Sequence, residues 1–339
     1  MTRVSIIVPV KNSQDTIGET VDALLRQTHP GALEILLVGD PQDATWDAIR
    51  PAIDSGSVRI IETRLDTRGR DANHKRNVGL RAATGDVLCL TDSDMAPPPH
   101  WIATGLALLS DGWPCVAGPM ASATPGFWGG YVDGNPIASK TPRMAGDYVA
   151  NRETLGVRGQ KPPITANVMF AREVYERVGG LDPRFVHSYE DYEWFQRIAD
   201  AGFDILCTPR LTARHQHRQG WGDLVREYHR SGRGCAQFVR KHRSSRFGRN
   251  RLQQLAAVVV LATLAVLDLL TVATGAWKPA VVFFAAGCTA AVLLSVATAV
   301  RTRRPEAAAY PIVTLILGMA FSAGMLAGLV PLAPARRSS

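Results

Sequence analysis

The feature that most constrains the fold is a sharp division in hydropathy near residue 251. Before it, the 339-residue chain mixes charged residues with short apolar runs, whereas three stretches beyond it are almost free of charge, at 255–277, 279–300 and 310–332. Each is long enough to cross the hydrocarbon core of a bilayer, which takes about 20 helical residues. A buried helical hairpin in a soluble protein is the alternative, but three such stretches in succession favour membrane spans.

This division predicts three regions: an N-terminal domain over 1–218, a basic juxtamembrane segment over 219–251 and three transmembrane helices over 252–335. Basic residues flank the first apolar stretch and separate the second from the third: Arg240, Lys241, Arg243, Arg246, Arg249, Arg251, Arg301, Arg303 and Arg304. By the positive-inside rule, the N-terminal domain is cytoplasmic and the chain is a multi-pass protein of the plasma membrane. Arg336 and Arg337, after the third stretch, argue against this orientation.

Charge and cysteine content limit the compartment and the partners. The net charge of +8 is concentrated beside the apolar stretches, so anionic lipid head groups explain it better than nucleic acid does. The five cysteines show no paired spacing, which indicates a reducing compartment and no zinc site. Asp268, inside the first apolar stretch, indicates either a functional carboxylate in a wet cavity or one with a polar partner near the interface, and we assign it no role.

Apolar residues recur at helical spacing just before the first apolar stretch, interleaved with arginines: Trp221, Leu224, Val225, Tyr228, Cys235, Phe238 and Val239. An amphipathic basic helix at this position suggests an element that lies in the membrane interface. Packing against the N-terminal domain is the alternative. Gly232 and Gly234 predict a kink in this helix.

The first third of the chain alternates β-rich runs with helical patterns, which is typical of a parallel α/β sheet with crossover helices. The predicted strands there are 4–10, 34–38, 58–62 and 87–90, and the predicted helices are 16–26, 45–53 and 73–83. A further strand is predicted at 165–170, followed by a helix at 172–178. We therefore predict an α/β, Rossmann-like domain. Ligands bind such sheets beyond the carboxyl ends of the strands.

Asp92, Ser93 and Asp94 follow the predicted strand 87–90 directly. A strand-end turn is one explanation, because Asp and Ser side chains hydrogen-bond their own backbone. The other is a site for Mg²⁺ or Mn²⁺, because both ions prefer carboxylate oxygens and can be presented to substrate phosphates.

Two further segments carry polar or aromatic signals. Residues 121–163 are rich in Gly and Pro and carry four aromatic residues, which favours a lid over a disordered insertion. Glu190 and Asp191 begin a predicted amphipathic helix, where either carboxylate alone is also explained by the helix dipole.

Taken in order, these segments resemble the family 2 glycosyltransferases with a GT-A fold. The resemblance covers residue 4 to about residue 218. It rests on six ordered motifs: SIIVPVKN, LLVGDPQDAT, HKRNVGLRAATGD, DSD, VGGLDPRF and YEDYEWFQR. It implies a GT-A domain that transfers a sugar from a nucleotide-diphospho sugar, with a UDP- or GDP-linked donor and Mg²⁺ or Mn²⁺ as cofactor.

The resemblance also implies roles for matching residues. It places Asp94 and His215 in the metal shell, and Asp191 at the position of the general base in the inverting members. The residues that it places near the donor nucleotide sugar are Pro9, Asp40, Asp43, Arg76, Asp92 and Glu190. One departure stands out: Gly39 precedes Asp40 where the family often has a second Asp, which leaves the choice between uridine and guanosine open.

A general base bears on the acceptor, because a hydroxyl must lose a proton as it attacks. A polyprenyl phosphate is already ionised and needs no base, so Asp191 favours a hydroxyl acceptor, lipid-linked or part of a cell-envelope glycan. The polyprenyl phosphate stays the alternative. The segment QHRQGW lacks the spacing of the motif of processive synthases, which favours transfer of one or a few sugars.

Three rival functions are open to the same sequence. A non-catalytic scaffold that binds nucleotide or lipid has no need of Asp92, Asp94 and Asp191 together. A nucleotidyltransferase usually has a Gly-rich loop after its first strand, which PVKNSQDT lacks. A nucleic-acid binder requires basic and aromatic residues spread over the N-terminal domain, and the basic residues here are concentrated elsewhere.

Overall fold

A computed structural model describes residues 2–29, 31–64, 71–134, 144, 146–157, 160, 162–217, 220–273 and 277–329. The chain divides into two compact units. The first, the catalytic-type unit, contains residues 1–125 and 140–217, and the second, the helical unit, contains residues 126–139 and 218–339.

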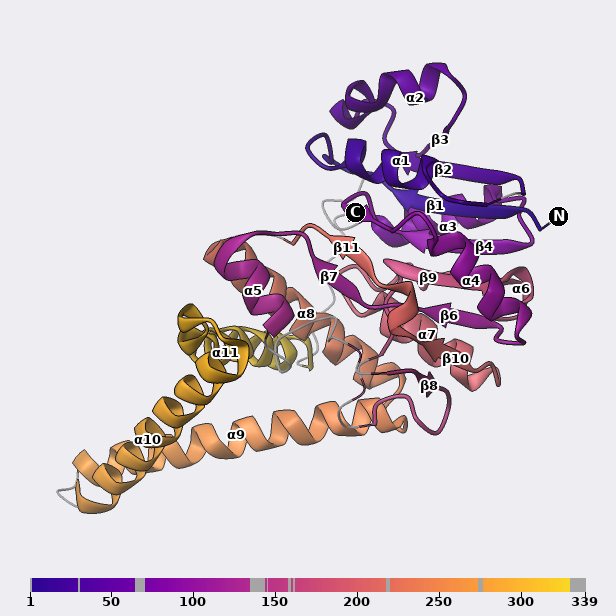
Figure 1. Cartoon of the computed structure of the whole chain (residues 1–339). Coiled ribbons are helices and arrows are strands. Elements are labelled where there is room, and N and C mark those ends of the chain that lie inside the picture. Colours follow the sequence, from indigo (N-terminus) through magenta and orange to yellow (C-terminus); the bar gives the residue numbers. More distant parts are fainter. Residues whose placement is uncertain are drawn as a thin grey trace, which may run out of the picture. The chain divides into compact units, whose positions relative to one another are not determined.

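The first half of the main sheet is parallel, as the sequence predicted (Figure 1). Its strands run in the order β3-β2-β1-β4 and are β1 Val4–Pro9, β2 Leu33–Gly39, β3 Arg59–Glu62 and β4 Val87–Thr91. The connecting helices are α1 Ile17–Leu25, η1 Ala44–Ile49, α2 Arg50–Asp54 and α3 Ala72–Ala82. The buried aliphatic side chains of β1 and β2 explain why their sequences read as continuous apolar runs.

The second half of the sheet is mixed, which the sequence did not predict. Strand β9 (Asn167–Ala171) pairs antiparallel with β4 and with β6 (Cys115–Ala117), and β10 (Ile205–Cys207) and β8 (Tyr148–Ala150) complete the eight strands. A smaller sheet has the order β5-β11-β7, with β5 Met95–Ala96, β11 Ala213–His215 and β7 Met120–Ser122. Helices α4 Trp101–Ser110, α6 Arg172–Val178 and α7 Glu190–Asp200 belong to the same unit.

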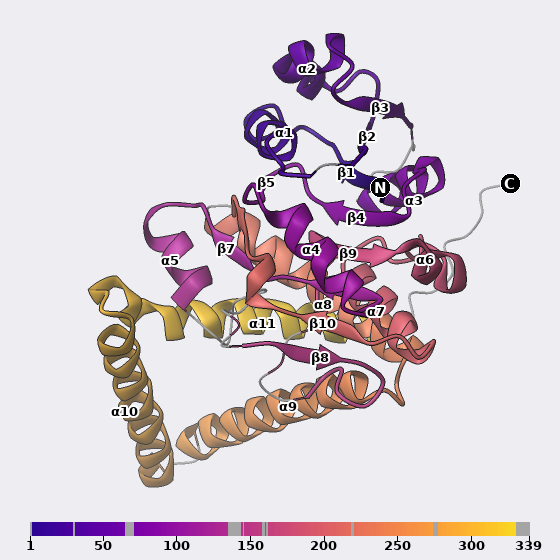
Figure 2. The same cartoon turned by 45° about the vertical axis from the view of Figure 1, so that its right-hand side comes forward.

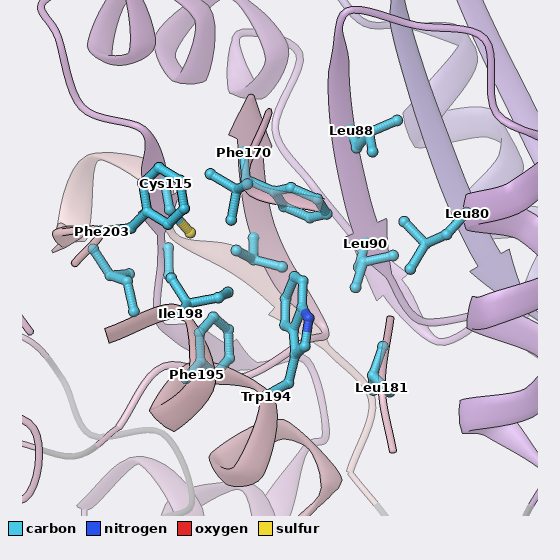
Figure 3. Packing of buried hydrophobic residues seen from close by; sticks show 14 of the residues in the cluster. Leu80, Leu88, Leu90, Cys115, Phe170, Leu181, Trp194, Phe195, Ile198 and Phe203 are labelled. Atoms are coloured by element: carbon cyan, nitrogen blue, oxygen red, sulfur yellow. The ribbon is translucent and has the colours of Figure 1, made fainter. Parts of the chain in front are cut away.

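Helix α7 is held by one of the apolar clusters of the sheet (Figure 3). Trp194, Phe195 and Ile198 are fully buried in it, and the Trp194 ring meets the Phe170 ring of β9 edge-on at 5.0 Å between centroids. The Trp194 indole also donates to the carbonyl oxygen of Gly179 at 2.9 Å. This packing fixes the start of α7, where Glu190 and Asp191 lie.

The helical unit contains α5 Gly126–Gly134, α8 Trp221–Lys241, α9 Arg246–Ala273, α10 Trp277–Thr302, η3 Pro305–Ala309 and α11 Tyr310–Leu329. Within the described residues, two helical stretches are long and apolar enough to cross a membrane, Arg246–Leu267 and Pro305–Leu329. The second predicted span coincides with α10, whose side chains are only partly described, and the side chain of Asp268 lies outside the described residues.

The predicted amphipathic helix is confirmed as α8, but it continues without interruption through Gly232 and Gly234. Gly232 instead allows a close approach, because a Cβ there would clash with the backbone of Phe321 on α11. The predicted lid is only partly described. Its aromatic residues Phe127, Trp128 and Tyr131 lie on α5 and pack against α8 and α11 side chains.

Candidate active site

The predicted site residues follow the carboxyl ends of neighbouring strands. Pro9 ends β1 opposite Val38 of β2, Asp40 follows β2 directly, and Asp92 follows β4. Because β1, β2 and β4 are parallel, their carboxyl ends share one edge of the sheet. The sequence therefore predicted the position of this group of residues correctly.

Arg76 connects two parts of the site that are far apart in sequence, the turn after β4 and the start of α7. Its side chain is buried on α3, with Nη2 2.5 Å from Oδ1 of Asp92 and Nη1 3.9 Å from Oε1 of Glu190. Burial disfavours the charged guanidinium, but Asp92, Glu190 and Asp191 together raise the pKa of Arg76 above its usual value. Arg76 is therefore a fixed positive charge among three carboxylates.

Ser93 anchors the turn that carries Asp92 and Asp94. Its hydroxyl lies 2.7 Å from that of Ser13, and its carbonyl oxygen accepts a hydrogen bond from the Thr16 hydroxyl at 2.9 Å. Ser13 and Thr16 follow β1, so the turn is attached to the neighbouring strand end. The carboxylates need not hold the turn themselves, which weakens the explanation of Asp-Ser-Asp as a strand-end turn alone.

Asp94 and His215 converge across two strands. Nε2 of His215 lies 3.3 Å from Oδ1 of Asp94, and the backbone N–H of Gln216 donates to the Asp94 carbonyl oxygen at 3.0 Å. The antiparallel pairing of β11 with β5 sets this approach. Nδ1 of His215 lies 2.9 Å from Nδ1 of His217, so one of the two nitrogens carries the shared proton.

These two side chains suit a hard divalent cation that is shared with a substrate. Among the described residues, no group of three or more His, Cys, Asp or Glu side chains is arranged to hold a metal ion. One carboxylate and one imidazole leave the remaining coordination positions to phosphate oxygens and water, as Mg²⁺ commonly requires. With the shared proton on Nδ1 of His215, the hydrogen bond to His217 orients the ring and leaves Nε2 unprotonated, as a metal-ligating nitrogen must be.

Asp40 and Asp43 differ in how far their carboxylates are already engaged. The carboxylate of Asp40 is half-exposed and accepts from the Gln42 N–H at 2.9 Å. Asp43 caps η1: Oδ1 accepts from the N–H and the hydroxyl of Thr45, and Oδ2 accepts from the N–H of Asn12. Asp40 is thus the more available group for a ligand.

Steric crowding explains why residue 39 is a glycine. A Cβ at this position would lie 2.7 Å from Cζ2 of Trp46 and 3.0 Å from the carbonyl oxygen of Val10. The Trp46 indole donates to the Asp40 carbonyl oxygen at 2.6 Å, which holds the ring in place. The packing of Trp46 therefore excludes the second Asp that the family often has here.

Asp43→Ala is expected to lower the stability of the catalytic-type unit by about 1 kcal/mol at pH 7, because it removes a helix cap. For a domain of this size that corresponds to a fall in Tm of about 2–4 °C. Burial acts to raise the pKa of Asp43, but hydrogen bonds from Thr45 and Asn12 and the charge of Lys75 lower it below its ordinary value of 3.8. The stabilisation is therefore complete above about pH 5 and is lost as the pH falls through the pKa of the folded state.

Thermal unfolding of the detergent-solubilised full chain, followed from pH 8 to about pH 3, checks this expectation. Asp47→Ala is the matched control, since Asp47 lies on the same short helix and pairs with the exposed Arg50. An equal loss of Tm in both variants would contradict the capping role.

Asp191 and Glu190 occupy the first turn of α7, as predicted. The backbone N–H of Tyr192 donates to Oδ1 of Asp191 at 2.8 Å. The preceding residue, Tyr189, is buried and has a left-handed backbone with φ of 72°, and its ring stacks on that of Tyr192 at 4.5 Å. Such a conformation is unfavourable for a non-glycine residue and is typical of functional sites.

Sequence reasoning missed several supporting residues. Lys75 is buried and donates from Nζ to the Val10 carbonyl oxygen at 2.7 Å, beside Asp71 at 2.8 Å. The backbone of His217 is fixed by Thr124, whose hydroxyl accepts from the His217 N–H at 2.7 Å. His217 lies two residues after His215, just beyond the end of β11, and this close spacing of two histidines was a usable signal.

The fold and the site together define a GT-A-like glycosyltransferase, with a mixed sheet and a strand-end carboxylate pair. The model of Glycosyl transferase family 2 matches residues 5–177, about half of the chain. The chain therefore belongs to glycosyltransferase family 2, whose members transfer a sugar from a nucleotide sugar.

Characterised relatives are similar to the chain at low identity. Glycosyltransferase AglE of Haloferax volcanii is 25% identical over 236 residues, which is 69% of this chain and 73% of AglE. The glucosyl-dolichyl phosphate glucuronosyltransferase of the same organism is 25% identical over 53% of this chain and 56% of its own length. The pre-mycofactocin glycosyltransferase of Mycobacterium tuberculosis is 23% identical, and the chain spans 44% of it.

Solved structures confirm the fold. The mannosyltransferase PcManGT from Pyrobaculum calidifontis, in complex with GDP-Man and Mn²⁺, aligns with a TM-score of 0.67 at 21% identity over 97% of this chain and 87% of that one. TarS of S. aureus (residues 1–349), in complex with UDP-GlcNAc, aligns with a TM-score of 0.51 at 14% identity over 70% of this chain and 66% of that one. These two neighbours bind guanosine and uridine donors respectively.

Proposed function

We propose that the protein is an inverting, metal-assisted glycosyltransferase that moves a sugar from a UDP- or GDP-linked donor to a hydroxyl group of a lipid-linked or cell-envelope acceptor. The observation that supports this best is the position of Arg76. It pairs with Asp92 in the strand-end turn and faces Glu190 at the start of α7. The buried guanidinium of Arg76 thus interacts both with the donor side of the site and with the start of α7, where its charge also interacts with that of Asp191.

Asp191 is the proposed general base. It accepts the proton of the acceptor hydroxyl as the oxygen attacks the anomeric carbon, and the bond from that carbon to the donor phosphate breaks. A single displacement of this kind inverts the configuration and needs no covalent intermediate. A positioned carboxylate contributes about 10²- to 10⁴-fold to such a step.

Asp94 and His215 are the proposed metal ligands. When bound, Mg²⁺ or Mn²⁺ supplies positive charge that stabilises the departing nucleoside diphosphate. The Mn²⁺ in the PcManGT complex supports this choice of ion. Asp92, which is held by Arg76, then orients the nucleotide and is not a metal ligand.

Two arguments support a hydroxyl group on a lipid-linked sugar as the acceptor: the presence of a general base and the name of one relative. A polyprenyl phosphate requires no base, whereas the hydroxyl of a sugar already carried by a lipid does. The name of the glucosyl-dolichyl phosphate glucuronosyltransferase describes an acceptor of the second kind. A lipid-linked acceptor also agrees with membrane anchoring of the chain through its apolar helices, with the catalytic-type unit on the cytoplasmic side of the plasma membrane.

Nucleotide release by the purified full-length chain in detergent tests the proposal. UDP- and GDP-sugars are supplied with Mn²⁺, Mg²⁺ or EDTA, with and without membrane lipid extract. We expect release from one donor that depends on a divalent cation and is stimulated by the extract. Tight nucleotide binding without release from any donor would favour the non-catalytic scaffold.

A further inference from the structure

Helix α11 does not have the surface of a simple membrane span. Its exposed apolar residues fall on one stripe at helical spacing, Ile312, Leu315, Ile316, Met319 and Leu326. The buried residues Val313, Leu317 and Met325 form another stripe, which faces the other helices of the same unit. By contrast, α9 exposes four consecutive apolar residues, 258–261, and α10 exposes three, 292–294, so their apolar surface continues around the helix.

The partner of the buried stripe is α8, and the two helices pack side by side and point in the same direction (Figures 1 and 2). At their beginnings, Leu224 and Tyr228 of α8 pack against the cluster that contains Tyr310 and Leu317. At their ends, Nη1 of Arg240 donates to the Gly328 carbonyl oxygen at 2.7 Å. With 21 and 20 residues, both helices are about 30 Å long.

Small residues bring the two backbones into direct contact. A Cβ at Gly324 would clash with the carbonyl oxygen of His229, and one at Gly328 would lie 2.8 Å from Cβ of Ala236. Gly324 and Gly328 are four residues apart, as are Gly232 and Ala236 on α8. This small-xxx-small arrangement fixes the pair as one unit, so α8 and α11 take the same position relative to a membrane.

The charged residues of α8 indicate whether the pair crosses the bilayer or lies in the plane of its interface. Seven of its residues are charged, distributed along the helix: Asp223, Arg226, Glu227, Arg230, Arg233, Arg240 and Lys241. If α11 crossed the bilayer, α8 would cross beside it and carry Arg230 and Arg233 near the centre. A charged arginine at the centre of a bilayer is strongly unfavourable. An in-plane position instead leaves these charges among the head groups while the exposed stripe of α11 enters the acyl region.

We propose that α11 lies in the plane of the cytoplasmic membrane interface, paired with α8, and that only α9 and α10 cross the bilayer. The inference rests on the membrane anchoring given above as part of the proposed function. The partner of the exposed α11 stripe is thus the acyl region of the bilayer. The aromatic rings at the start of the pair, Trp221, Trp128 and Tyr131, are of the types enriched at such interfaces.

This arrangement removes a conflict in the basic residues. Three spans place Arg301, Arg303 and Arg304 on the cytoplasmic side but Arg336 and Arg337 on the opposite side. With α11 in the plane of the interface, both groups lie on the cytoplasmic side, as the positive-inside rule requires. Length and composition alone select η3 and α11 as a span, because they do not take account of the charged helix beside it.

Depth measurements on spin labels test the inference. The full-length chain, with its native cysteines replaced, is placed in vesicles of phosphatidylethanolamine and phosphatidylglycerol and labelled singly at Ile312→Cys, Met319→Cys or Leu326→Cys. The first and last positions are 14 residues apart, about 21 Å along a helix. We expect nearly equal, shallow immersion at all three, and a graded profile with Met319 deepest would overturn the proposal.

Leu252→Cys, Val259→Cys and Val266→Cys on α9 are the matched control, with the same spacing and exposed or half-exposed positions. They are expected to show a graded profile. Shallow immersion at all six positions would overturn the two crossing helices together with the proposed membrane anchoring, whereas a graded profile on α11 overturns only the in-plane position.

The side of the membrane gives an independent readout. Ser338→Cys is expected to react with a membrane-impermeant maleimide from the same side as Asp54→Cys, an exposed position in the catalytic-type unit. Reaction from opposite sides supports three spans and would overturn the proposal.

Discussion

Asp191→Asn is expected to lower the rate of sugar transfer by about 10²- to 10⁴-fold while leaving the affinity for the donor nucleotide sugar nearly unchanged. The amide keeps the size of the side chain and still accepts the hydrogen bond that the Tyr192 N–H donates to Oδ1. What it loses is the ability to take a proton from the acceptor. Single-turnover transfer, measured beside donor binding by calorimetry, separates the two quantities.

Asp200→Asn is the matched control for this substitution. Asp200 ends the same helix and accepts from the Gln196 amide at 3.0 Å, but it lies at the opposite end from Asp191. Its replacement should leave transfer unchanged. If Asp191→Asn weakens donor binding as much as it slows transfer, Asp191 is not the base but part of the donor site, since it contributes to the charge balance of Arg76.

The parallel half of the sheet could be predicted from the sequence because its strands are short, apolar and separated by helical patterns. The actual bounds of β1, β2, β3 and β4 differ from the predicted ones by one residue at most. The direction of β9 could not be predicted in the same way. Hydropathy shows that Asn167–Ala171 is buried, but a buried strand has the same pattern whether it runs parallel or antiparallel to its neighbour.

Very short strands were missed for a related reason. The small sheet is made of two or three residues per strand, too few for any alternation to be visible. Yet this sheet brings His215 to Asp94. The pairing of these two residues was expected only from the resemblance to family 2, not from spacing along the chain, because more than one hundred residues separate them.

In the helical unit the elements could be predicted from the sequence, but their packing could not. Its apolar stretches were easy to find, but their relation to α8 depends on glycines that read locally as kink sites. Gly232 was predicted to bend α8, whereas in the structure it brings α8 against α11. A single helix sequence cannot distinguish the two roles, because both require the absence of a side chain. The distinction emerges only once the partner helix is known.

Asp94→Asn is expected to lower metal-dependent nucleotide release by about 10²- to 10³-fold, the size of loss seen when one group that stabilises developing charge is removed. The substitution takes away the only full negative charge of the Asp94–His215 pair, so Mn²⁺ should also bind more weakly in the presence of nucleoside diphosphate. The electron paramagnetic resonance signal of free Mn²⁺ measures that binding without turnover. Asp111→Asn, an exposed carboxylate at the end of α4, is the matched control.

A double-mutant comparison sharpens the test of Asp94. If Asp94 and His215 hold one ion together, either substitution alone removes most of the effect, and His215→Asn combined with Asp94→Asn should lower Mn²⁺ affinity little further. Independent roles predict losses that add. Full additivity would therefore remove His215 from the metal shell and reduce its 3.3 Å contact with Asp94 to a structural hydrogen bond. The Asp-Ser-Asp turn would then act on the donor through Asp94 alone.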